Sequence, residues 1–202
     1  MGADIHAYLE RYNKESKRWE HLSLYKKNDD DSFDPIQVYN SRNYELFGLL
    51  AGVRGSSHFF SECYGYIVEP RGIPEDISSY ARLEWEKGKD EDGTQWWHTP
   101  TWYDFCELKT YAHLLSEMNN GIKKRDKKIR LLEDEIGKLN MQNDDEGCDW
   151  FGDYYSDEDD EEEYTAFDAL SGFVNCIQDV LYEYGIWHPK PNEIRVVIWF
   201  DN

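Results

Sequence analysis

Apolar and polar side chains alternate over the first eleven residues of the chain. A period of two is typical of a β-strand with one buried face. A polar turn follows, and residues 19–24 are suited to return as the second strand of a hairpin. Residues 194–200 form an almost unbroken apolar run, which is typical of a central strand covered on both faces. The pattern therefore predicts one sheet that contains both terminal strands.

Two amphipathic helices are expected to pack against this sheet. Ser41 or Asn43 is suited to cap the first helix, and Gly55 is expected to end it. The second helix covers residues 164–184, where apolar side chains recur at helical spacing along a single stripe. Gly185 is expected to stop this helix.

The chain between these two helices has less regular patterning. Residues 55–104 combine glycine, proline and aromatic residues, with one short strand expected at 64–68, and residues 101–118 have helical spacing. Residues 122–139 carry an a/d heptad pattern among charged residues, which indicates a solvated helix with a narrow apolar seam. This helix either pairs antiparallel, with a second copy or with the acidic segment that follows, or packs alone on the body.

These elements predict an α+β fold. Its mixed or antiparallel sheet contains both terminal strands, two amphipathic helices pack on it, and a helical arm protrudes. A chain of 202 residues is long enough for one sizeable core. We expect residues 1–118 and 164–202 to form that core, with residues 119–163 inserted as a helical arm plus an acidic loop.

The formal net charge of −20 is concentrated in one segment of the chain. Residues 144–163 hold 12 acidic residues and no basic ones, which leaves 30 acidic and 22 basic residues elsewhere, a net charge of −8. An acidic surface repels a polyanion, so we expect no direct binding to nucleic acid. The 16% aromatic content indicates a folded chain despite this charge.

The absence of targeting signals and the spacing of the cysteines both indicate a protein of the reducing cytoplasm. No apolar run approaches the length of a membrane helix, and the N-terminus is too polar for a signal peptide, so we expect a soluble protein of the cytoplasm. The four cysteines are widely spaced and lack the close pairs of zinc sites, which favours free thiols.

The polar face of the first strand carries candidate metal ligands. Asp4 and His6 lie about 7 Å apart along one strand face, and both types of side chain serve in metal binding and acid–base chemistry. His98 and Asp201 complete a His/Asp set if the two terminal strands are neighbours. A divalent metal ion is then the expected cofactor. Alternatively, Asp4 bonds to Arg195 or to a loop backbone, and His6 is a core histidine.

A second candidate site is basic. Arg42, Arg54 and Arg71 lie beside turns of small residues such as Ser56. A guanidinium group grips two phosphate oxygens, and small residues let backbone amides approach. Neighbouring aromatic residues such as Trp102 are suited to stack on a base. The alternative is that each arginine pairs with a carboxylate. The chain has neither a P-loop motif nor a dinucleotide-binding glycine motif.

An ordered series of motifs also carries a resemblance. The motifs are MGADIH at 1–6, RNYELF at 42–47, PRGIPEDIS at 70–78 and WFDN at 199–202. The chain resembles a family of small uncharacterised bacteriophage proteins whose members often begin MGCDIH and end WFDN. The resemblance covers about residues 1–115 and the last ten residues. Ala3 stands where the family often has cysteine, which argues against a required ligand or nucleophile there.

The resemblance implies an accessory role in the host cytosol but no established activity, and the sequence discloses no reaction. The first hypothesis is an anti-defence type of phage accessory protein that binds a small phosphorylated nucleotide or nucleotide-derived signal. The second is a metal-dependent hydrolase of such a nucleotide. The third is an acidic inhibitor that binds a host protein by imitating the charge of nucleic acid. Residues 122–139 offer a surface for a homo-oligomer, and no membrane partner is expected.

Overall fold

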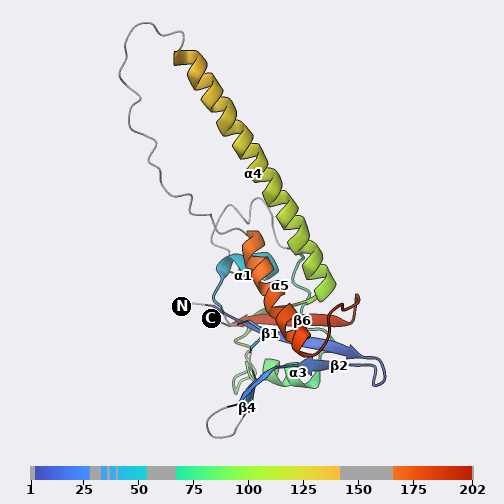
Figure 1. The fold of residues 1–202 in the computed structure, drawn as a ribbon. Coiled ribbons are helices and arrows are strands. Elements are labelled where there is room, and N and C mark those ends of the chain that lie inside the picture. Colours follow the sequence, from blue (N-terminus) through green and yellow to red (C-terminus); the bar gives the residue numbers. More distant parts are fainter. Residues whose placement is uncertain are drawn as a thin grey trace.

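The computed structural model describes residues 3–27, 33–35, 37–39, 41–53, 67–141 and 166–201. Its main sheet has four antiparallel strands in the order β2-β1-β6-β5. Figure 1 labels β2, β1 and β6 of this sheet. They are β1 Asp4–Asn13, β2 Arg18–Leu22, β5 His98–Asp104 and β6 Ile194–Asp201. A separate pair is formed by β3 Tyr25–Lys27 and β4 Phe33–Pro35. The predicted α+β fold is confirmed, and the sheet is antiparallel.

The first and last strands of the sheet are direct neighbours, as predicted. β1 pairs with β6 from Asp4 opposite Asp201 to Arg11 opposite Ile194. β6 lies between β1 and β5, and its residues from Ile194 to Phe200 are all buried, which confirms the central strand. β2 returns from β1 as the expected hairpin, with Leu22 opposite Leu9 at its end.

The main core lies on one face of this sheet. Alternate residues of β1 and β6 pack there against α1 Tyr44–Ala51, α5 Ala166–Glu183 and the start of α4 Phe105–Met141. Phe47, Phe173 and Phe200 are among its fully buried side chains. Burying one such side chain is worth roughly 1.5–3 kcal/mol, so this layer supplies most of the apolar stabilisation.

Both predicted amphipathic helices are present, and one of them ends earlier than expected. Asn43 caps α1 by accepting a hydrogen bond from Leu46 N at 3.1 Å. The helix ends at Gly52 rather than Gly55, because Gly52 already adopts the left-handed conformation with φ of 69°. α5 matches the expected helix, and Gly185 follows it with φ of 69°.

Residues 101–118 were expected to be helical throughout, which is wrong for the first four. Residues 98–104 form β5, whose Thr101 and Tyr103 are buried against β6, and the helix begins only at Phe105. α4 then continues without a break through residues 122–139 to Met141. Its 37 residues span roughly 55 Å, and its far half extends away from the sheet (Figure 1).

The second face of the sheet carries a smaller core that the sequence patterns do not reveal. Residues 55–104 were expected to be largely irregular, but their described part contains α3 Ser79–Glu86 as well as β5. Ala81 of α3 packs with Ile77 against Val197 and Trp199 of β6. Only Ala81 of this short helix is fully buried, so no apolar stripe marks it. Residues 64–66 of the expected strand at 64–68 lie outside the described residues.

Candidate functional site

The polar residues of the two terminal strands meet, as the sequence predicted. The His6 Nε2 atom lies 3.0 Å from the Asp201 Oδ2 atom, and the Asp4 backbone N–H donates to Asp201 Oδ1 at 3.0 Å. The His6 ring also packs 5.0 Å from the ring of Trp97. Asp201 therefore positions both the backbone and the imidazole of the neighbouring strand.

The Asp4 carboxylate, however, is occupied by a residue from the second predicted site. Arg42 donates from Nε to Asp4 Oδ1 and from Nη2 to Asp4 Oδ2, the latter at 2.8 Å. These bonds hold the pKa of Asp4 below its ordinary value and raise that of Arg42. A metal ion at Asp4, or a phosphate at Arg42, would have to displace this ion pair. The alternative partner considered for Asp4, Arg195, bonds elsewhere.

His98 faces away from the other candidate metal ligands. β5 pairs with β6 at Thr101 opposite Ile198, but a bulge then places His98 opposite Phe200. A regular antiparallel register would bring His98 opposite Asp201, so the extra residue moves its ring to the other face of the sheet. There it packs 6.2 Å from the Phe200 ring. In the described part of the chain, no group of three or more His, Cys, Asp or Glu side chains could hold a metal ion.

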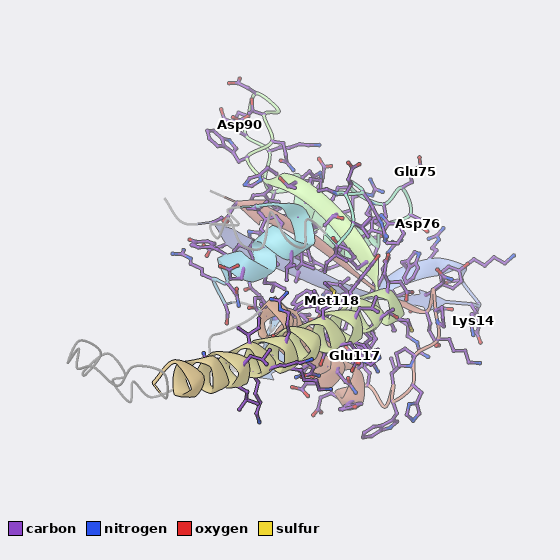
Figure 2. All side chains as sticks on the ribbon, turned by 90° about the horizontal axis from the view of Figure 1, so that it is seen from above. Lys14, Glu75, Asp76, Asp90, Glu117 and Met118 are labelled. Atoms are coloured by element: carbon purple, nitrogen blue, oxygen red, sulfur yellow. The ribbon has the colours of Figure 1, made fainter. Side chains whose placement is uncertain are left out.

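Arg71 and Trp102 lie together in a larger groove, which we call the tryptophan groove. Its volume is about 470 Å³, and its lining includes Trp19, Arg71, Asp76, Trp102 and Arg195. Figure 2 shows Glu75 and Asp76 together, well away from Glu117 and Met118 of α4. The groove lies at the second face of the sheet. Arg54 and Ser56 lie outside the described residues.

Each arginine of the tryptophan groove stacks on an indole ring and binds carboxylates. The Arg71 guanidinium lies 4.8 Å from the Trp102 ring centroid, bonds to Trp102 O at 3.2 Å and forms two hydrogen bonds with Glu107. The bonds with Glu107 raise the pKa of Arg71. Arg71 therefore stays positively charged, but both of its Nη atoms are bonded to the Glu107 carboxylate.

Arg195 forms the buried half of the same groove. Its guanidinium lies 4.0 Å from the Trp19 ring and donates to Glu10 Oε2 and to Asp76 Oδ1, both at 2.7 Å. Trp19 Nε1 also donates to Asp76, at 2.9 Å. Burial on its own would raise the pKa of Asp76. The hydrogen bond and the charge of Arg195, together with the bond from Trp19, outweigh burial and lower that pKa. These contacts make one wall of the groove rigid.

A third site was missed at the level of the sequence. A cavity of about 150 Å³ is lined by His6 and Tyr8 of β1, His21 of β2, and Tyr80 and Glu84 of α3, among others. We call it the histidine pocket. The alternation of β1 places Tyr8 beside His6, but α3 carries no periodic signal, so the sequence could not bring Tyr80 and Glu84 to this place.

The two described cysteines, Cys106 and Cys176, are free thiols. Burial raises the pKa of both, which makes them poor nucleophiles. Among the described residues, no helix has an apolar stretch long enough to span a bilayer.

Comparison of the chain with protein-family models, curated proteins and solved structures finds no match. Proposals about function therefore depend on the geometry of the sites.

Proposed function

We propose that the protein binds a small nucleotide or nucleotide-derived compound in the tryptophan groove, as an accessory protein of the phage type that its motifs resemble. The observation that carries this proposal is the pairing of two indole rings with two guanidinium groups around one groove. Indole rings bind any nucleobase by stacking, at roughly 1–3 kcal/mol per base. Guanidinium groups supply hydrogen-bond donors and a cationic surface.

The size of the groove supports a ligand of this class. Small-molecule sites enclose roughly 300–1,000 Å³, and the tryptophan groove has about 470 Å³. Its walls combine the apolar side chains of Ile73 and Pro74 with the polar groups of Arg71 and Asp104. Such a mixture of apolar surface and a few directed polar groups is typical of sites that fix the orientation of a ligand.

The Glu107 carboxylate limits how Arg71 can bind a phosphate group. Arg71 gives both of its Nη atoms to Glu107, and among the described residues its Nε atom has no hydrogen-bond partner. A phosphate therefore has to share Arg71 with Glu107 or displace that carboxylate. Base stacking supplies most of the affinity under this arrangement, and the phosphate adds a smaller increment.

Calorimetric titration of the full chain with AMP and with adenosine tests the proposal. Trp102→Leu removes one stacking surface and is expected to weaken binding of both ligands by at least about ten-fold. Glu107→Gln removes the competing charge and is expected to strengthen the binding of AMP more than that of adenosine.

Trp187→Leu is the matched control, because Trp187 is exposed and stacks on Tyr182 of α5, away from the groove. It should bind both ligands as the wild type does. Mass spectrometry of compounds released from the denatured, host-expressed protein extends the test to other nucleotides. The proposal fails if no nucleotide is released and neither ligand binds saturably.

A further inference from the structure

The histidine pocket lies beside the part of β1 that does not pair with β2. β2 pairs with β1 only from Leu9 to Asn13, so within the described part of the chain residues 4–8 of β1 pair with β6 alone. The pocket opens beside this free edge and is covered by α3 and by residues 35, 37 and 38. Its volume of about 150 Å³ equals roughly five water molecules, so it fits a small group rather than a nucleotide.

His21 presents a hydrogen-bond acceptor to this pocket. Its Nδ1 atom lies 3.1 Å from the Leu9 carbonyl oxygen, which only accepts hydrogen bonds, so Nδ1 carries the proton. Nε2 then bears a lone pair, and it has no partner among the described residues. Burial lowers the pKa of His21, which keeps the ring neutral at pH 7.

Glu84 adds a negative charge to the same lining. One of its carboxylate oxygens accepts from Lys87 Nζ at 2.6 Å, and the other has no hydrogen-bond partner among the described residues. The Glu84 side chain is only 17% exposed, whereas that of Lys87 is 58% exposed. The carboxylate therefore lies against the pocket, while its lysine partner is largely in solvent.

Two phenol rings, those of Tyr8 and Tyr80, also line the pocket. His21 stacks on Tyr80 with a centroid distance of 4.3 Å, and the Tyr8 ring lies 5.8 Å from His21. Burial raises the pKa of Tyr8 and of Tyr80, so neither ring becomes anionic at neutral pH. The faces of such rings carry negative quadrupole potential and attract cations.

We propose that the histidine pocket binds the ammonium group of a small organic amine. A carboxylate, a neutral imidazole with a free lone pair and two phenol rings all favour a cation that donates hydrogen bonds. An anion is disfavoured because Glu84 repels it. The negative field of the whole chain also concentrates cations near the surface. None of the groove residues discussed above lines this pocket, so the proposal is independent of nucleotide binding.

The test is an NMR titration of the ¹⁵N-labelled full chain with methylammonium chloride, against sodium chloride at equal ionic strength. The expected result is saturable shifts of the backbone amides of Tyr8, His21, Tyr80 and Glu84. Glu84→Gln keeps the shape of the side chain but removes its charge, and is expected to weaken binding at least about ten-fold.

Glu86→Gln is the matched control on the same helix, because Glu86 forms an exposed pair with Lys89. It should bind methylammonium as tightly as the wild type. Tyr80→Leu removes a ring face and is expected to weaken binding, with the rest of the spectrum showing that the fold is kept. The proposal is overturned if the shifts are linear and match those of sodium chloride. Equal affinity of Glu84→Gln and the wild type, or saturation of the same amides by phosphate, would also overturn it.

Discussion

Arg195 and Glu10 form the most buried ion pair in the described part of the protein. The side chains of Arg195 and Glu10 are 4% and 0% exposed, and Glu10 also accepts from the Ser78 backbone N–H at 2.8 Å. Two opposite charges on the adjacent strands β1 and β6 are thus buried next to Ser78, the residue that caps α3. Such a pair costs desolvation, and removing Glu10 leaves the buried Arg195 charge with only the largely exposed Asp76 as a carboxylate partner among the described residues.

Glu10→Gln is therefore expected to lower the free energy of unfolding by about 3 kcal/mol. Glutamine keeps an acceptor for Ser78 N–H but loses the charge that balances Arg195. Urea unfolding of both proteins at pH 7.5 measures the difference. Glu86→Gln serves as the control, since its exposed pair with Lys89 is worth less than about 1 kcal/mol. A Glu10→Gln protein as stable as this control would show that Asp76 alone compensates Arg195.

The residues of the candidate metal site show what sequence can and cannot determine at this scale. The contact of His6 with Asp201 follows from the alternation of β1 and the pairing of the terminal strands, both of which were predicted. The orientation of His98 depends on one extra residue in β5, and the partner of Asp4 is Arg42, 38 residues away. Neither a bulge nor a non-local ion pair leaves a periodic signal.

Among the elements, glycine at the end of α1 and glycine inside α4 are expected to respond in opposite ways to replacement by alanine. Gly52 ends α1 with φ of 69°, a conformation that strains any residue with a Cβ atom. Gly121 lies inside α4, where an added Cβ atom meets nothing within 4 Å. Glycine in a helix interior is less favourable than alanine by roughly 0.5–1 kcal/mol.

Gly52→Ala is expected to destabilise the protein by about 1–2 kcal/mol, whereas Gly121→Ala should increase the helical content of α4. Urea unfolding measures the first change, and far-ultraviolet circular dichroism measures the second. Each variant is the control for the other, because both make the same chemical change. Equal stability of Gly52→Ala and the wild type would show that the end of α1 does not depend on glycine in the left-handed conformation.

The elements that were predicted correctly share one property, which is a strong local pattern of apolar residues. β1 and α5 each bury one face or stripe, and β6 is an apolar run buried on both faces, so the pattern indicates the conformation of each element. α3 buries only Ala81 within the helix, and its fixed place results from aromatic contacts such as Trp85 with Trp199. Residues 101–104 of β5 were assigned to the helix that follows them. Phe105 and Leu108 have helical spacing, and the prediction extended this helix back past its true start at Phe105.

The seam of α4 remains a prediction at this scale. Ile129, Leu131 and Leu132 are 45%, 56% and 47% exposed, and the side chains of residues 133–141 lie outside the described residues. The helix passes through residue 118 without interruption, so the expected division into a core and an inserted arm has no break in secondary structure there.

At the scale of the whole molecule, stability is expected to fall with acidification in two stages. Burial lowers the pKa of His21 below its ordinary value of 6.5, and the bond with Arg42 lowers that of Asp4 below 3.8. Each group binds protons more readily when unfolded, so each contributes stability that is present above its unfolded pKa and is lost as pH falls through its folded pKa. The first stage therefore begins below pH 6.5 and the second below pH 3.8.

Urea unfolding between pH 7.5 and pH 5 measures the first stage. His21→Asn is expected to flatten the curve over this range, because asparagine can donate to the Leu9 carbonyl but does not titrate. The wild-type protein should lose stability toward pH 5. An identical slope in both proteins would assign the loss to other groups.

The pairing of β1 with β6 has a consequence for the order of events in folding. Asp4 and Asp201 are in contact although they are 197 positions apart in the sequence. During synthesis, β1 leaves the ribosome long before β6 exists, and only the hairpin with β2 is available to it. The centre of the sheet is then filled last, by a strand that must enter between β1 and β5. Closing so large a loop is entropically slow, so the nascent chain leaves one edge of β1, with its backbone N–H and C=O groups, unpaired for most of its translation.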